Sequence, residues 1–391
     1  MKNAALLRLS QTSLLTLGLA ASASAQGEAF ALYGTGGGGS SAGDFLELDS
    51  TDFAPNELIE TTYGRMTGLA FAADGRVWAS VRFPFNNLLE LDLATGQVVG
   101  TVPLKFVGTN PWVSDLAIQP GTGTMFGIGA SDFTERGTLH TVDTASGFLT
   151  EIGSTGTGSQ GGLAFAADGT LYMTPTTSPF SLHTLDPATG AVLSSVLLAA
   201  QVAVDGLAVD PTSGALLGCT RMGQILEIEP ATGATTVLSD LGPNVSALAF
   251  GPVGAKEKVR NSELGEPNLA QLLPGVTSGP VIGEVWDPVL VASPGTTSLI
   301  DVLITALGPA DLPFLPGPNG VLLCNIFSGP GIADTNFSTP VGGVQQPFAI
   351  PFPDQASLVG ITLCTQGGYA DGTTPGLIHL TNALDITIGA F

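Results

Sequence analysis

Basic side chains are scarce in this sequence of 391 residues. Eleven Lys and Arg stand against 33 Asp and Glu, and the formal net charge at pH 7 is −22. A surface this acidic repels phosphate backbones and anionic lipid headgroups, so we expect neither nucleic acid nor a membrane surface as a partner. The charge favours solubility through self-repulsion, and it also suits a salty or calcium-containing exterior.

Long apolar runs are missing after the first 25 residues, so we expect no transmembrane span. The N-terminus has the pattern of a signal peptide. Lys2 and Arg8 precede an apolar stretch around Leu14–Leu19, and the small residues of 23–25 follow. The sequence therefore predicts a signal peptide over residues 1–25 and export of the mature chain to the periplasm, the cell surface or the extracellular space.

Cysteine is limited to three residues. Cys219 stands alone in an apolar run and is expected to be a small buried side chain. Cys324 and Cys364 lie in two strand-like runs of the later part of the chain, and an oxidising compartment would allow them to pair. Two strands need not be adjacent, so a disulfide and two free thiols both agree with the sequence.

Runs of Lys, Glu and Gln are also absent, whereas Gly and Pro are abundant at 53 and 27 residues. This composition depletes helix and favours short strands joined by turns. The strands recur in a repeat. GLAFAADG occurs at 68–75 and again at 162–169, and Leu-Ala pairs begin at residues 69, 116, 163, 207 and 248. A period of about 40 to 50 residues with four strand-like runs is typical of a β-propeller.

The ends of the repeat region predict how the ring closes. Three runs (30–34, 45–49 and 57–62) precede the first Leu-Ala pair, and one orphan run (246–252) follows the last complete unit. Together they make one four-stranded blade. We therefore predict an all-β fold in which residues 26–252 form a five-bladed propeller closed by strands from both ends, which removes the exposed sheet edge.

The pattern stops after residue 252. Residues 253–265 carry Lys256, Lys258 and Arg260 in a polar stretch, which we interpret as a linker. Residues 266–391 contain no Lys or Arg and about seven strand candidates separated by Pro and Gly. A β-sandwich is the expected fold of this second domain.

Catalytic motifs are missing or stand in the wrong context. GxGxxG and GxSxG matches fall within 34–43, where a strand follows instead of the required helix, so a flexible loop is expected. His140 and His183 occupy third-strand positions that are Leu in other repeats, which predicts core histidines. His379 has no partner at metal-ligand spacing. We predict no catalytic residue.

Two carboxylates stand where first strands begin. Asp115 (VSDLAI) and Asp205 (VDGLAV) would lie near the central channel of a propeller, where carboxylate and carbonyl oxygens suit Ca²⁺. The alternative is structural, with each Asp capping exposed backbone amides at a strand start.

A group of aromatic, amide and guanidinium side chains falls on loops that a propeller would bring to the same end. Such side chains suit recognition of an extracellular glycan or a protein ligand. The aromatics would alternatively pack under their own loops. The predicted binding residues are Arg82, Phe85, Asn86, Asn87, Asn110, Trp112 and Arg136.

The repeats GLAFAADGTLY (162–172) and LHTLDPATGAV (182–192) resemble those of secreted bacterial β-propellers of the NHL, YVTN and lactonase-like type over residues 30–252. The resemblance implies that catalytic members hold a divalent metal in the channel through Glu, Asn and Asp of several blades. Residues 357–389 are similar to the C-terminal β-sandwich modules that end many exported bacterial proteins and serve surface attachment or sorting.

We therefore expect an exported, non-enzymatic binding protein whose propeller loops present the ligand-binding face. A calcium-dependent hydrolase or lactonase with its site at the channel mouth is one alternative. A structural protein of the cell envelope is another.

Overall fold

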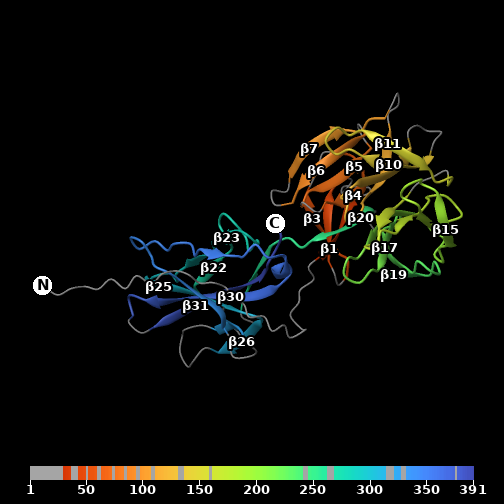
Figure 1. Cartoon of the computed structure of the whole chain (residues 1–391). Coiled ribbons are helices and arrows are strands. Elements are labelled where there is room, and N and C mark those ends of the chain that lie inside the picture. Colours follow the sequence, from red (N-terminus) through yellow and green to blue (C-terminus); the bar gives the residue numbers. More distant parts are fainter. Residues whose placement is uncertain are drawn as a thin grey trace. The chain divides into compact units, whose positions relative to one another are not determined.

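The computed structural model describes residues 30–36, 43–49, 52–59, 63–72, 75–82, 86–93, 97–106, 111–130, 136–157, 161–240, 245–261, 268–313, 321–326, 332–374 and 377–391. The predicted signal peptide lies outside them. The described chain divides into two compact units, Phe30–Pro252 and the part from Val253 to Phe391. We call them the N-terminal and C-terminal units (Figure 1). Among the described residues, no helix is long and apolar enough to span a membrane.

The described N-terminal unit consists of four-stranded antiparallel sheets, as the repeat predicts. In each sheet that follows the first, the four strands are consecutive in the chain. The first sheet is β20 (Val245–Pro252), β1 (Phe30–Gly36), β2 (Phe45–Leu48) and β3 (Pro55–Ile59). The others are β4 (Met66–Phe71), β5 (Val77–Val81), β6 (Asn87–Asp92) and β7 (Gln97–Pro103); β8 (Trp112–Ile118), β9 (Met125–Ala130), β10 (Arg136–Val142) and β11 (Leu149–Ser154); β12 (Leu163–Phe165), β13 (Leu171–Met173), β14 (Ser181–Leu185) and β15 (Val192–Leu197); and β16 (Val204–Val209), β17 (Leu216–Thr220), β18 (Gln224–Ile228) and β19 (Thr235–Asp240).

The first of these sheets combines the two ends of the unit. β20 pairs antiparallel with β1, so that Leu32 lies opposite Phe250 and Tyr33 opposite Ala249. The Tyr33 hydroxyl also donates to the Pro252 carbonyl oxygen at 2.8 Å. The run at 246–252 therefore joins the sheet that begins at residue 30.

One strand of each sheet lies toward the middle of the unit, and we call β20, β4, β8, β12 and β16 the inner strands. β4 neighbours β8, β8 neighbours β12, β12 neighbours β16, β16 neighbours β20, and β20 neighbours β4. Hydroxyl groups at the ends of second strands join three pairs of neighbouring sheets. Thr35 donates to the Met66 carbonyl at 3.3 Å, Ser80 to that of Val113 at 3.4 Å, and Thr174 to that of Val204 at 3.0 Å.

Apolar clusters fill the spaces between neighbouring sheets. One joins Ala70 and Trp78 to Leu116 and Met125, so it lies between the β4 and β8 sheets. Similar clusters lie between the next sheets along the chain. Both faces of a sheet are thus buried, which explains why the inner strands are apolar along most of their length.

The turns between third and fourth strands use Asp and Gly as the sequence predicts. Asp143 Oδ1 accepts the backbone N–H groups of Ala145 and Ser146 at 2.9 and 3.0 Å. Gly147 then takes a φ of 72°, which a residue with a Cβ rarely adopts. Asp186 with Gly190 repeats the arrangement.

The C-terminal unit contains a five-stranded antiparallel sheet and smaller strand pairs among its described residues. The sheet has the order β21 (Lys256–Arg260), β31 (Ile378–Thr387), β30 (Thr362–Asp371), β25 (Ser298–Ala306) and β28 (Ile332–Ser338). The pairs are β22 (Gln271–Leu273) with β24 (Val289–Val291), β23 (Val285–Trp286) with β29 (Ile350–Pro351), and β26 (Pro309–Pro313) with β27 (Val321–Cys324).

An apolar core lies between this sheet and the β22–β24 and β23–β29 pairs. Leu303, Leu363 and Leu384 of the sheet pack in one cluster with Trp286 and Leu290 of the pairs. A second cluster contains Cys324 and Cys364, which form a disulfide with a Cα–Cα distance of 5.5 Å. Cys219 of the N-terminal unit is a buried free thiol.

The linker predicted over 253–265 is wrong for residues 256–260, which form strand β21 and pair with β31. Arg260 explains why this polar stretch is ordered. Its guanidinium pairs with Asp385 at 2.9 Å and donates to the carbonyl oxygens of Ala310 and Leu323. It also contacts Cys364 Sγ at 3.1 Å. Arg260 was expected to be solvated, but it contacts residues of four other strands and joins them to β21.

Candidate functional site

Three of the inner strands share an irregularity where they begin. The register shifts between Met66 and Gly68 in β4, and in the same way in β8 and β16. The residues at these bulges are Thr67, Ser114 and Asp205. We call this end of the N-terminal unit, with the connections from second to third strands, the mouth face. Bulges often lie next to functional sites, where they redirect a side chain. The mouth face is therefore the candidate location of a functional site.

Asp115 lies one residue beyond the bulge of β8, and its side chain is fully buried. Its Oδ1 accepts the N–H of Leu116 at 2.9 Å, and its Oδ2 accepts those of Leu163 at 2.8 Å and Leu207 at 3.4 Å. These donors belong to three different inner strands. One carboxylate thus ties three sheets together.

The residues that match Asp115 in the other inner strands are small. They are Gly68, Gly162, Gly206 and Ala247. A Cβ added at Gly68 would lie 2.7 Å from the Asp115 Cα, and one at Gly206 would lie 2.7 Å from the Ala247 Cα. The space between the inner strands therefore admits only one larger side chain at this level, and Asp115 fills it.

Burial raises the pKa of Asp115 well above its ordinary value, while the N–H donors, Leu163 first, act in the opposite direction. Desolvation is the larger of these influences. This carboxyl is therefore held away from water, and its acceptor positions are directed at backbone amides.

Asp205 lies at the bulge of β16 and forms ion pairs with two arginines. Its Oδ2 is 2.8 Å from Arg65 Nη2 and 3.1 Å from Arg221 Nε. Arg221 Nη2 reaches Oδ1 at 3.2 Å, and Arg65 Nε donates to Ser246 Oγ at 2.8 Å. The side chain of Asp205 is 5% exposed, whereas those of Arg65 and Arg221 are 37% and 59% exposed.

The calcium site predicted at Asp115 and Asp205 does not fit this geometry. Both carboxylates accept N–H donors, which occupy the lone pairs that a Ca²⁺ ion would need. Within the described ranges, no group of three or more His, Cys, Asp or Glu side chains is placed to hold a metal ion. The two aspartates also differ by one position along their strands, since Asp115 matches Gly206 rather than Asp205. The alternative reading, an Asp that caps backbone amides, describes Asp115.

The predicted ligand-binding residues are brought together only in part. The Arg82 guanidinium lies 4.3 Å from the centre of the Trp112 ring, a cation–π contact between the β5–β6 connection and β8. Asn86 is half-buried, whereas Asn87 is only 6% exposed and lies in β6 between Val81 and Pro103. Asn87 therefore offers little surface to a ligand.

Three further predicted residues cannot be placed at the site. Phe85 and Asn110 lie outside the described residues, and Arg136 is described only as the first backbone position of β10. The sequence analysis also missed Arg65, Arg221 and Ser246. These residues lie outside the recurring apolar runs or match a neutral position in them, so the repeat gave them no signal.

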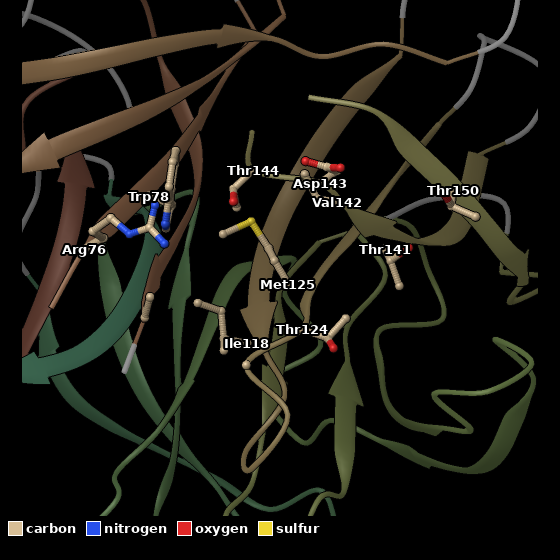
Figure 2. Close-up of a pocket in the computed structure, with 12 residues that line it drawn as sticks. Arg76, Trp78, Ile118, Thr124, Met125, Thr141, Val142, Asp143, Thr144 and Thr150 are labelled. Atoms are coloured by element: carbon tan, nitrogen blue, oxygen red, sulfur yellow. The ribbon is translucent and has the colours of Figure 1, made fainter. Parts of the chain in front are cut away.

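A pocket of about 670 Å³ lies at the opposite end of the N-terminal unit, between the β4 and β8 sheets. Figure 2 shows Arg76 and Trp78 on one side, Thr141 and Thr150 on the other, and Met125 between them. The Arg76 guanidinium lies 5.4 Å from the centre of the Trp78 ring. Trp78 is itself buried, so it offers no open aromatic surface to a sugar.

The C-terminal unit places His379 beside an acidic partner that sequence spacing did not indicate. His379 Nε2 lies 3.4 Å from Asp371 Oδ2, and its ring stacks on Tyr369. The β30–β31 hairpin causes this, since Tyr369 and His379 are paired residues. Hydrogen bonds from the Thr373 side chain and backbone and from His379 lower the pKa of Asp371 to about 2.

No family model matches the chain, and no curated protein matches it. Solved structures are similar at low identity. A structure of a nidogen/laminin complex matches with a TM-score of 0.41 and 14% identity, over 56% of this chain and 98% of that one. A gluconolactonase from Xanthomonas campestris matches with a TM-score of 0.37 and 15% identity, over 57% and 80%. A protein of unknown function from Bacteroides caccae matches with a TM-score of 0.38 and 14% identity, over 56% and 98%. At these values the likeness assigns neither an activity nor a ligand.

Proposed function

We propose that residues 26–252 form a five-bladed propeller and act as an exported, non-enzymatic binding protein whose mouth face takes a glycan or a peptide. The neighbour order of the inner strands supports a ring, since it runs from β20 through β4, β8, β12 and β16 and returns to β20. The pairing of β20 with β1 supports closure by strands from both ends.

One observation carries the non-enzymatic part. The oxygens of Asp115 accept backbone N–H groups from three inner strands. A hydrogen-bonded plug thus stands where the family resemblance would put a coordinated ion. What the mouth face offers instead is guanidinium and indole groups, which suit recognition.

The Arg82–Trp112 pair gives the most direct test of binding. The full chain is titrated with ligands selected on glycan and peptide arrays, and Arg82→Met is compared with Arg76→Met. The control is matched, because Arg76 also lies over a Trp ring but at the opposite end of the unit. We expect Arg82→Met to weaken binding at least tenfold and Arg76→Met to leave it unchanged. Equal effects of the two substitutions would contradict a ligand site at the mouth face.

The enzymatic alternative is tested on the same protein with a panel of ester and lactone substrates, with and without a chelator. We expect no turnover and no heat of Ca²⁺ binding in calorimetry. Turnover that the chelator abolishes and that Asp115→Ala removes would replace the binding proposal by a calcium-dependent hydrolase or lactonase.

Residues 266–391, together with strand β21, are proposed to form a β-sandwich that serves attachment or sorting at the cell envelope. The packing of Leu303, Leu363 and Leu384 against Trp286 and Leu290 supports two layers. Cell fractionation of the full chain tests the role, together with N-terminal sequencing of the mature protein. We expect the mature protein to begin at Gln26 and to leave the cytoplasm. A fully cytoplasmic protein that still begins at Met1 would contradict export.

A further inference from the structure

Arg65, Asp205 and Arg221 form a charged triad at the mouth face, with Ser246 beside it. Two guanidinium groups and one carboxylate leave one net positive charge in a protein whose formal net charge is −22. We propose that this triad binds a single carboxylate group of a small ligand. The inference rests on the proposed binding function and names the chemistry of its ligand.

The hydrogen bonds of the triad leave donors available. Asp205 takes Nη2 of Arg65 together with Nε and Nη2 of Arg221. Ser246 takes Nε of Arg65. The Nη1 group of neither arginine is engaged within the described part of the chain. One N–H of Nη1 and the neighbouring N–H of Nη2 form the parallel pair of donors that matches the two oxygens of a carboxylate.

Asp205 fixes the two arginines in place. It is nearly buried and accepts from both at its Oδ2, so both guanidinium groups are held against one atom. The arginines themselves are 37% and 59% exposed, so a solute reaches them. Long side chains that are already held lose little conformational freedom when a ligand binds, which favours affinity.

The triad lies where three sheets meet. Arg65 immediately precedes β4, Asp205 and Ser246 lie in β16 and β20, and Arg221 follows β17. These inner strands are neighbours. A ligand whose carboxylate is held here would therefore extend over the start of the inner strands. The rest of the ligand would meet main-chain groups of several sheets there.

Charge decides which anions fit. One net positive charge matches a monoanion. A polyanion would bring further charges against an acidic protein and be repelled. The turns at the opposite end of the unit are acidic and include Asp143, Asp186 and Asp210. They add to the repulsion of a polyanion. The ligand is thus a molecule with one carboxylate, such as a sugar acid or the C-terminus of a short neutral peptide.

A purely structural triad would need only one arginine, because a single guanidinium neutralises Asp205. Arg221→Met separates the two roles. It keeps the Arg65–Asp205 pair and the Arg65–Ser246 bond, and the side chain that it changes is the more exposed of the two. Arg76→Met is the control for the loss of one positive charge, since Arg76 lies at the opposite end of the unit.

The test is isothermal titration of the full chain with two probe pairs. Galacturonate is compared with galactose, and N-acetyl-trialanine with its C-terminal amide. We expect at least one carboxylate probe to bind and its neutral counterpart to bind at least tenfold more weakly. Arg221→Met should lose at least tenfold in affinity with an unchanged melting temperature, while Arg76→Met binds as wild type. Which pair responds distinguishes a sugar acid from a peptide terminus.

Two results overturn the inference. One is that neither carboxylate probe binds; the other is that binding persists unchanged in Arg221→Met. If array-selected neutral ligands bind through Arg82 but not Arg221, the binding function stands and the carboxylate site is wrong. If no ligand of any kind binds, both proposals fail.

Discussion

Asp115 fills the space between the inner strands with one buried side chain. The matching positions of the other inner strands are Gly or Ala, and a Cβ at Gly68 or Gly206 would clash with a neighbouring backbone. The strands therefore approach too closely for more than one side chain, and that side chain must satisfy the amides around it. An Asp side chain, whose two oxygens accept N–H groups from several directions, is suited to that place.

Replacement of Asp115 by Ala should strongly destabilise the N-terminal unit. The N–H groups of Leu116, Leu163 and Leu207 would lose their common acceptor in a buried place, at a cost of about 1–3 kcal/mol for each unsatisfied group. We expect the free energy of unfolding to fall by about 3 kcal/mol or more in urea denaturation. Asp143→Ala, which removes an exposed turn cap, is the control and should have a much smaller effect. Similar effects of both substitutions would mean that Asp115 does not join the sheets.

The raised pKa of Asp115 gives a pH dependence of definite sign. In the unfolded chain an Asp titrates near about pH 4, whereas burial raises the pKa in the folded protein. The folded state then binds the extra proton, so the contribution of Asp115 to stability falls as pH rises above about 4. We expect wild type to lose stability relative to Asp115→Asn between pH 4 and pH 7, measured by chemical denaturation at each pH. A difference that is constant with pH would show that this carboxyl keeps its ordinary pKa.

The candidate site was predictable only where the repeat carried it. Asp115 and Asp205 were found because both stand near a Leu-Ala pair, but whether the two share a site depends on a one-residue offset. Arg65 lies 140 residues from Asp205 in sequence, and only the meeting of β4 with β16 brings them together. No local pattern encodes such a pair, so the arginines were missed.

Strand β21 marks the limit of prediction at the scale of the element. The repeated sheets follow from apolar periodicity and turn residues, and the structure has them where the pattern predicts. Residues 256–260 have no apolar alternation, and their Lys and Arg suggested a solvated linker. Their order comes instead from Arg260 and from backbone pairing with β31, a partner more than a hundred residues away in the chain.

Arg260→Met should therefore destabilise the C-terminal unit. It would leave Asp385 half-buried without its partner and two carbonyl oxygens without a donor, at a cost of about 2–4 kcal/mol. Lys258→Met on the same strand changes an exposed side chain and should have an effect within about 0.5 kcal/mol. Fluorescence of Trp286, which is the one Trp of residues 253–391, reports this unit. If both substitutions act alike, Arg260 is a surface residue in solution.

At the scale of the whole molecule, the two units differ in how they are held together. The N-terminal unit relies on packing between sheets and on Asp115, and its cysteine is a free thiol. The C-terminal unit carries a disulfide that closes a segment of 40 residues. Covalent closure of a loop this long is worth about 3–4 kcal/mol through the entropy of the unfolded chain.

A reductant should act on one unit only. We expect calorimetry to show two transitions, of which the one followed by Trp286 fluorescence shifts to lower temperature when a phosphine reductant is added. The other transition should stay in place, because no disulfide is present among the described residues of the N-terminal unit. A common shift of both transitions would show that the units unfold as one.

The pairing of β20 with β1 also imposes an order on folding. The Tyr33 hydroxyl bonds to a carbonyl 219 residues further along the chain, so the first sheet lacks one strand until residue 252 has been synthesised. Contacts this distant in sequence make folding slow. Until then β1 presents an open edge to which other chains can add a strand. A ribosome-bound or truncated chain is thus exposed to association throughout the synthesis of this unit, and the last eight residues of the unit, Val245–Pro252, end that exposure.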